Sequence, residues 1–206
     1  MKKVNLPLNK TETGVSWLIP GALTLVSTYN SKKEPNIAPK NWIHPAAFSP
    51  PLIVYSGPLF ATTEKNIIVT KCFTINFVDS SLAEIACNCI RWFGKERIAK
   101  SSLNLVEASK INAPLIAECK AHLECTLYNM YIHEHGFVVL GEVVAVSIWD
   151  KILHSGPEEQ YELLDLTIPR QNGICTLVNK IKPIHGFSET IQIHKKKVEQ
   201  YLKEKS

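Results

Sequence analysis

Residues 35–66 carry the side chains best suited to chemistry. Near the end of this block, Thr62, Thr63 and Lys65 stand at the start of a predicted helix. The first amides of a helix have no partner within it, so with two hydroxyl groups and an ammonium group they can bind an anion such as phosphate. An ordinary capped helix with one solvated lysine fits the same residues. This short pattern alone therefore leaves both interpretations open.

The histidines offer weaker alternatives. His133 and His135 would share one face of a strand, but no third ligand is evident, so we predict no metal site. His44 lies two residues beyond Trp42 and is expected to bond to nearby backbone, with a contact to a ligand as the alternative. His122 is predicted to face solvent. No GxSxG, P-loop or GxGxxG motif occurs, which argues against a nucleophilic triad and a Rossmann nucleotide site.

Six cysteines could suggest disulfides, but their surroundings do not. Most sit inside apolar runs, where a free thiol behaves as a small hydrophobic group, and no CxxC pair occurs. We predict reduced structural thiols in a soluble cytoplasmic protein, because the first residues also lack the apolar stretch of a signal peptide. The cysteines are Cys72, Cys87, Cys89, Cys119, Cys125 and Cys175.

The elements that would position these groups can be predicted from local patterns. Strands are expected at 21–28, 36–38, 42–48, 52–56 and 72–78. A helix is expected over 62–71, with a Thr as its cap and Glu64 in its first turn, where the helix dipole favours a carboxylate.

A second helix is predicted to start at the capping box from Ser81 to Glu84. Its apolar stripe should face the core; it consists of Leu82, Ile85, Ala86, Cys89 and Phe93.

The middle of the chain has the clearest strand pattern. Polar and apolar residues alternate over 118–127, which predicts one wet face and one buried face. Residues 137–148 are apolar on both faces, which favours a barrel wall covered by helices or by a second subunit. A further strand is expected at 174–178 and a charged helix at 195–204. We predict a single α+β domain, mainly β, over 1–206, with its core at about 17–180, the C-terminal helix within 190–206, and an antiparallel barrel.

The net charge of +4 at pH 7 comes from the two ends of the 206-residue chain. Residues 191–206 contribute +3, Lys2 and Lys3 contribute +2, and the remaining body carries −1. A nucleic-acid surface would need basic residues spread over the folded body, so we predict no nucleic-acid partner. No apolar run approaches the roughly 18 residues that span a bilayer, so we predict no membrane partner.

Several ordered blocks within residues 20–148 resemble the flavin reductase-like family, the FMN-binding split barrels that include flavoredoxin. The resemblance rests on the following residues, in chain order: Pro35-Asn36-Ile37-Ala38-Pro39, Asn41-Trp42, Pro50-Pro51, Thr63, Asn66-Ile67, Phe73-Thr74-Ile75-Asn76 and Val139-Leu140-Gly141-Glu142-Val143. It implies an antiparallel split barrel with flanking helices that binds FMN without covalent attachment at the interface of a homodimer.

The resemblance also implies positions for the parts of the cofactor. The isoalloxazine edge would lie at Lys40, Asn41, Trp42 and Ile43, and the ribityl chain at Ser56 and Gly57. Thr62, Thr63 and Lys65 would take the phosphate. Lys40 would either favour the anionic reduced flavin or point into solvent. Arg170 is considered as a further phosphate contact across the dimer.

This chain departs from the family at the nicotinamide position. Many reductases of the family have a histidine just before the later strand, where Gly136 stands here, so His135 is only a neighbour of that position. Three functions stay open: an FMN-dependent reductase that takes hydride from NADH or NADPH, a flavoredoxin-like electron carrier, and a non-redox flavin-binding module. The flavin would carry the chemistry, so no protein catalytic residue is predicted; the acceptor would be a small molecule or a protein.

Overall fold

A computed structural model describes residues 19, 21–58, 60–92, 94–169, 175–177 and 203. The elements are β1 Thr24–Tyr29, β2 Pro35–Lys40, β3 Ile43–Phe48, β4 Pro51–Gly57, α2 Thr62–Thr70, β5 Cys72–Phe77, α3 Ala83–Asn88, α4 Gly94–Ser101, β6 Leu105–Glu107, β7 Pro114–Ile116, β8 Ala121–His133, β9 Gly136–Ile148, α5 Asp150–Leu153, α6 Pro157–Leu164, β10 Thr167–Pro169 and β11 Cys175–Leu177. Each strand and helix predicted within the described residues is present, with shifts of a few residues at the ends.

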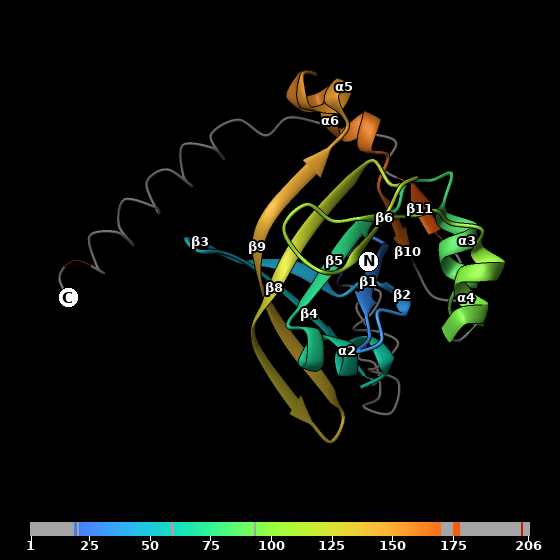
Figure 1. The fold of residues 1–206 in the computed structure, drawn as a ribbon. Helices are drawn as coiled ribbons and strands as arrows, with labels where there is room; N and C mark the ends of the chain where they lie inside the picture. The colour runs from blue at the N-terminus through green and yellow to red at the C-terminus, as the bar shows by residue number, and fades with distance from the viewer. Residues whose placement is uncertain are drawn as a thin grey trace, which may run out of the picture.

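Seven antiparallel strands form the main sheet in the order β2-β1-β5-β8-β9-β4-β3 (Figure 1). The two edge strands are consecutive in the chain, and only Asn41 and Trp42 separate the end of β2 from the start of β3. Because consecutive Cα atoms are about 3.8 Å apart, these two edges approach within about 11 Å at that point. The sheet must therefore curl on itself, and it forms an antiparallel split barrel with flanking helices, as predicted.

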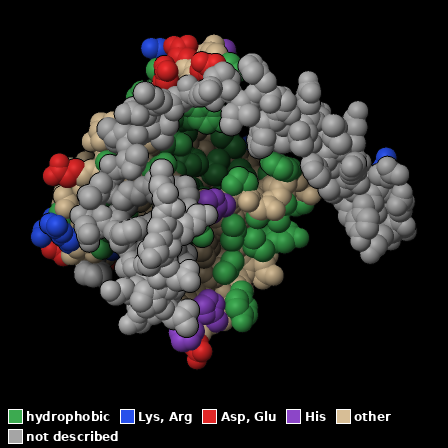
Figure 2. Space-filling view, turned by 180° about the vertical axis from the view of Figure 1, so that it is seen from behind, with side chains coloured by type: hydrophobic (Ala, Val, Ile, Leu, Met, Phe, Trp, Pro, Cys, Tyr) green, Lys and Arg blue, Asp and Glu red, His purple; other side chains and the backbone are tan. Residues whose placement is uncertain are grey.

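The longest strands, β8 and β9, form a hairpin that extends beyond the barrel (Figure 1). The apolar residues of 137–148 have different surroundings in the two halves of β9. Phe137 and Val139 are buried in the barrel, whereas Val144 and Val146 are exposed on the strand's second half. Seen from behind, the molecule has an area of exposed hydrophobic side chains (Figure 2).

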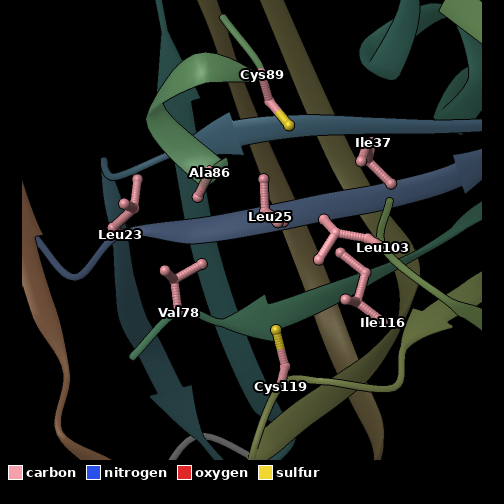
Figure 3. Close-up of a cluster of buried hydrophobic side chains, with 9 residues drawn as sticks. All are labelled: Leu23, Leu25, Ile37, Val78, Ala86, Cys89, Leu103, Ile116 and Cys119. Atoms are coloured by element: carbon pink, nitrogen blue, oxygen red, sulfur yellow. The ribbon is translucent and has the colours of Figure 1, made fainter. Parts of the chain in front are cut away.

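Two clusters of buried side chains lie on opposite faces of β1. Leu25 belongs to the first cluster, under α3, and Val26 belongs to the second, inside the barrel. The first cluster contains Leu23, Leu25, Ile37, Val78, Ala86, Cys89, Leu103, Ile116 and Cys119 (Figure 3). The predicted stripe of α3 packs there, with Leu82 and Ile85 against the cluster; Phe93 lies outside the described residues.

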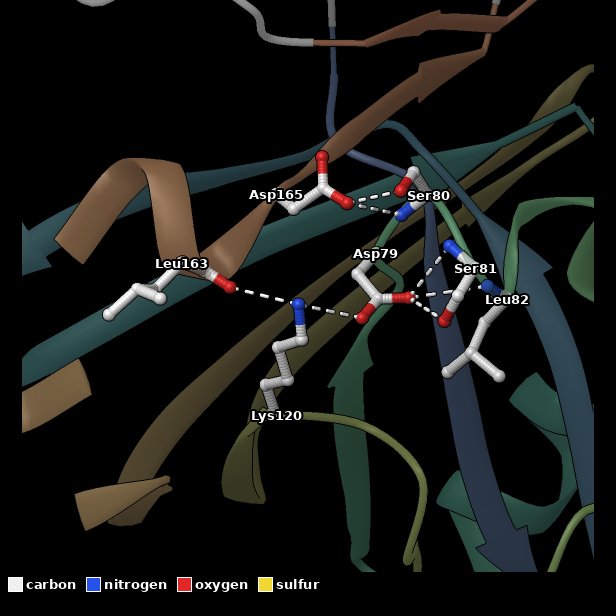
Figure 4. A network of polar contacts seen from close by, with 7 residues as sticks. All are labelled: Asp79, Ser80, Ser81, Leu82, Lys120, Leu163 and Asp165. Carbon is white, nitrogen blue, oxygen red and sulfur yellow. Dashed lines mark hydrogen bonds and ion pairs between the residues drawn. The ribbon is translucent and has the colours of Figure 1, made fainter. Parts of the chain in front are cut away.

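The start of α3 is capped differently from the prediction. The N-cap residue is Leu82, and Ser81 does not cap the helix with its hydroxyl group. Instead, Asp79 Oδ1 accepts hydrogen bonds from Ser81 N at 3.0 Å, Ser81 Oγ at 2.7 Å and Leu82 N at 3.2 Å (Figure 4). A carboxylate binds several amides at once, so Asp79 takes the role expected of Ser81.

The same side chain connects the C-terminal part of the described chain to the barrel. Asp79 Oδ2 lies 2.9 Å from Lys120 Nζ, which also donates to Leu163 O at 2.9 Å (Figure 4). Asp165, just after α6, accepts from Ser80 N at 3.3 Å and also from Ser80 Oγ. These contacts hold α6 to the end of β5.

The predicted wet face of 118–127 is wrong at its centre. His122 and Glu124 are buried, because residues 103–116 fold back over this face of β8. Glu124 accepts hydrogen bonds from Ser109 N at 2.9 Å and Lys110 N at 2.7 Å. His122 Nε2 lies 2.9 Å from Ile116 O, and burial lowers the pKa of His122. Polar groups are thus buried with hydrogen-bond partners rather than solvated.

The predictions on cysteines, membrane spans, metal sites and the C-terminal residues can be compared with the described part of the chain. Five cysteines are free thiols, as predicted: Cys72, Cys87, Cys89, Cys119 and Cys125. The side chain of Cys175 lies outside the described part of the structure. Across the described ranges, no helix is long and apolar enough to cross a membrane, and no cluster of three or more potential metal ligands occurs. Arg170 and the helix expected at 195–204 lie outside these ranges, apart from a single helical residue at Lys203.

Candidate functional site

Glu64 joins three elements that are far apart in the sequence. It is the third residue of α2, and its side chain is fully buried. Its Oε1 lies 2.8 Å from Lys40 Nζ at the end of β2 and accepts a hydrogen bond from Tyr55 Oη on β4 at 3.2 Å. Its Oε2 accepts from Ala61 N at 2.8 Å. The start of α2, the end of β2 and the C-terminal part of β4 therefore meet around one carboxylate.

The connection between β2 and β3 follows the rim of the barrel beside this carboxylate. Ser56 N donates to Trp42 O at 3.1 Å, which ties the connection to β4. Ile43 pairs with Tyr55 in the strand register, and the side chain of Trp42 is exposed. The structure thus brings together the residues predicted for the ring edge and for the ribityl chain, with an exposed indole beside a half-buried Ser56.

Lys40 does not point into solvent, which was one of the two alternatives expected from the sequence. Its ammonium is paired with Glu64, and only 16% of its side chain is exposed. It also lies over the aromatic rings of Phe137, at 5.0 Å, and Tyr55, at 5.8 Å. Burial, followed by the nearby negative charge of Glu64, raises the pKa of Tyr55 well above its usual value, so this phenol stays protonated and donates.

The first amides of α2 have no acceptor within the helix, and two polar side chains beside them face solvent. The N-cap is Ala61 rather than a threonine, and Glu64 supplies the acceptor for its amide. Thr62 and Lys65 are exposed. Thr63 is buried and accepts a hydrogen bond from Asn36 Nδ2 at 3.0 Å, so its hydroxyl is already part of the packing between α2 and β2. The predicted phosphate residues thus divide into two exposed ones and one buried one.

Two glycines fit the end of β4 closely against the β8–β9 hairpin. A Cβ on Gly57 would lie 2.9 Å from the ring of Phe137, and a Cβ on Gly136 would lie 2.4 Å from Gly57 O. Gly136 also has a φ of 158°, which L-residues rarely adopt. A histidine at position 136 would therefore clash with backbone, which gives a steric reason for the departure from the family pattern.

The histidines of the hairpin tip make contacts with their neighbours. His133 stacks on Tyr131 with ring centroids 5.8 Å apart, and His135 lies 2.9 Å from Glu134. Both histidines are exposed. His44 is exposed on β3, opposite Val54.

Sequence reasoning missed the central role of Glu64 and Tyr55. Glu64 was assigned only to the helix dipole, and Tyr55 lies in the apolar run of β4, which gives no hint of a polar partner. The available signal was a carboxylate three residues into a helix whose preceding residue, Ala61, has no capping side chain. Its partners come from β2 and β4, so spacing along the chain could not identify them.

An antiparallel split barrel, with a helix start and a strand connection meeting at its rim, is the class of architecture that this chain adopts. Residues 17–161 match the family described as flavin reductase like domain. The chain belongs to that family.

Three known proteins illustrate what this chain is similar to in sequence or in fold. A protein of Methanothermobacter thermautotrophicus without an assigned function is 28% identical over 179 residues, covering 81% of this chain and 84% of its own length. The 2-nitrobenzoate 2-nitroreductase of Pseudomonas fluorescens superposes with a TM-score of 0.78 at 22% identity, covering 90% of this chain and 98% of that one. The flavoredoxin of Desulfovibrio vulgaris has a TM-score of 0.76 at 20% identity, covering 92% and 99%. At these identities the two structures support the fold.

Proposed function

We propose that this protein binds FMN and acts as an NAD(P)H-dependent reductase of the flavin reductase type, passing electrons to an acceptor. The observation that carries the proposal is the meeting of the β2–β3 connection, the C-terminal part of β4 and the start of α2 around Glu64. In a chain that belongs to this family, a strand rim that could carry a flat ring and a helix start that could carry a phosphate lie in one region, which supports the proposal.

The residues present fit such a cofactor. The backbone of the rim from Lys40 to Ile43, with the exposed side chain of Trp42, would lie along the ring edge, and Ser56 and Gly57 would border the ribityl chain. The amides at the start of α2, with Thr62 and Lys65, would take the phosphate, while the buried Thr63 would hold the helix in place through Asn36. Bound FMN supplies hydride and electron transfer; the protein binds and orients it.

A homodimer would complete this site. Exposed apolar side chains on the hairpin and on the edge strand β3 support an interface, since exposed patches of this kind mark association surfaces. They are Phe48, Tyr128, Tyr131, Ile132, Val144 and Val146. Sedimentation of the FMN-bound protein should give a dimer, and a monomer with FMN bound would contradict this part of the proposal.

The reductase can be tested by the absorption spectrum of the purified protein under anaerobic conditions. A yellow protein that NADH or NADPH bleaches rapidly supports the proposal. One specific observation favours a flavoredoxin-like electron carrier instead: Gly136 cannot be replaced by the histidine of many reductases without a clash. Bleaching by dithionite but by neither nicotinamide would select the carrier. A colourless protein that does not take up added FMN would leave a non-redox module.

The phosphate position can be tested on an exposed side chain alone. Lys65→Ala should weaken FMN binding by roughly tenfold and leave riboflavin binding unchanged, because riboflavin has no phosphate and a charge-assisted contact contributes on the order of 1.5–3 kcal/mol before solvent screening. Lys100→Ala, at an exposed ion pair on α4, is the matched control. Equal FMN affinity in both variants would remove Lys65 from the site.

A further inference from the structure

Lys40 and Glu64 form a charge pair at the place where an anion would bind. The two charged atoms are 2.8 Å apart, with 16% of the Lys40 side chain and none of the Glu64 side chain exposed. Such burial distinguishes this pair from exposed ones, for example Lys100 with Glu96 at 2.7 Å, where each side chain is 53% exposed.

The carboxylate of Glu64 would compete with a bound phosphate if it carried an uncompensated charge. Both anions favour the positive end of the α2 dipole, and Glu64 already accepts hydrogen bonds from the Ala61 amide and the Tyr55 hydroxyl. Removing Lys40 would leave these two donors on the carboxylate but take away its only cation partner among the described ion pairs. In a poorly solvated place, a fixed negative charge repels a second anion strongly.

Neighbouring groups fix both the side chain and the backbone of Lys40. The rings of Phe137 and Tyr55 lie beneath it, and the backbone oxygen of Lys40 accepts a hydrogen bond from Thr24 Oγ1 at 2.8 Å. A lysine fixed in this way is unlike a solvated one that could swing to the cofactor. Its position is set by the fold of the protein itself.

We propose that Lys40 is a positioning residue: it is the buried counter-ion of Glu64, and the neutral pair leaves the start of α2 able to accept the phosphate of FMN. This inference rests on the proposed flavin site. It replaces a direct contact between the Lys40 ammonium and the flavin ring. Lys40 thereby acts on the cofactor through Glu64, and its effect should be confined to the charged end of the ligand.

The experiment measures dissociation constants of FMN and riboflavin for the wild-type protein and for four variants, one of them a control, with thermal unfolding in parallel. Lys40→Met should weaken FMN binding by roughly tenfold and change riboflavin binding by less than about twofold, because only FMN carries the repelled charge. Glu64→Gln should tighten FMN relative to riboflavin. The double variant should return to the wild-type ratio of the two affinities.

The matched control is Lys100→Met, which removes the same charge from an exposed pair and should leave both affinities unchanged. If Lys40→Met does not fold, the nearly isosteric Glu64→Gln decides by itself. An FMN-to-riboflavin ratio equal in all variants, or equal losses for both flavins, overturns the inference while the flavin site stands. A wild-type protein that binds neither flavin overturns the proposed function and this inference with it.

Discussion

Replacing Asp79 by asparagine should destabilise the protein by about 2–3 kcal/mol, because it leaves a largely buried cation without its partner. The pair joins Lys120 Nζ to Asp79 Oδ2 at 2.9 Å, with side-chain exposures of 19% and 8%. Its gross attraction is about 6 kcal/mol at an effective dielectric constant of about 20. Breaking a buried pair costs about 3–5 kcal/mol, and we reduce this because Lys120 keeps partial exposure and its bond to Leu163 O.

The choice of variant separates the ion pair from the helix cap. Asp79→Asn removes the charge and keeps the cap, because the amide side chain retains an oxygen for the backbone N–H groups of Ser81 and Leu82. Asp79→Ala removes both and should cost about 1 kcal/mol more. Urea unfolding at about pH 7 measures the losses, and a loss of about 2–3 kcal/mol corresponds to roughly 5–10 °C in Tm for a chain of this size.

The pH dependence follows from the direction of the Asp79 pKa. Burial raises this pKa, but hydrogen bonds from Ser81 and Leu82 and the charge of Lys120 outweigh burial, so it lies below its ordinary value. A lowered pKa gives stability that is present above the unfolded value of about 3.9 and is lost as the pH falls through the folded value. The penalty of Asp79→Asn should therefore shrink at about pH 3.

A double-mutant cycle with Lys120→Met tests the reasoning directly. The coupling energy should exceed about 1 kcal/mol, since the two charges are in contact and poorly solvated. A coupling below about 0.5 kcal/mol, the range of exposed pairs, would refute the assignment of the loss to this ion pair.

Two further predictions concern packing. Gly141→Ala should destabilise the protein by about 1–3 kcal/mol in urea unfolding, because the new Cβ would lie 2.5 Å from the buried ring of Phe73. The control is Gly156→Ala, whose Cβ would have nothing within 4 Å and should change stability by less than about 0.5 kcal/mol. Equal effects of the two variants would contradict the packing argument. Burial raises the pKa of Cys119 and Cys125 to about 12. Both thiols should therefore resist thiol reagents at about pH 8 until the protein is unfolded. Peptide mapping that finds either cysteine labelled in the folded protein would contradict this prediction.

The local patterns of this sequence predicted the strands of the main sheet and the helices α2 and α3, but not α4, α5, α6 or the short strands β6, β7 and β10. Apolar runs bounded by turn residues located the strands, and the motifs spread over residues 20–148 placed the chain in one known family. Alternation over 118–127 identified the strand but misplaced His122 and Glu124, because period-two patterns describe faces and cannot say what folds over them. That face is covered by a segment that reaches Glu124 through Ser109 and Lys110.

What the sequence alone determined is therefore the strands of the main sheet, the helices α2 and α3, and the family to which the chain belongs. Tertiary structure alone decided the partners of the charged side chains. Lys40 and Glu64 are separated by 24 positions, and Asp79 and Lys120 by more. These charges are tolerated in poorly solvated places only because the fold brings opposite charges into contact. A local sequence pattern cannot show which residues far apart in the chain will meet.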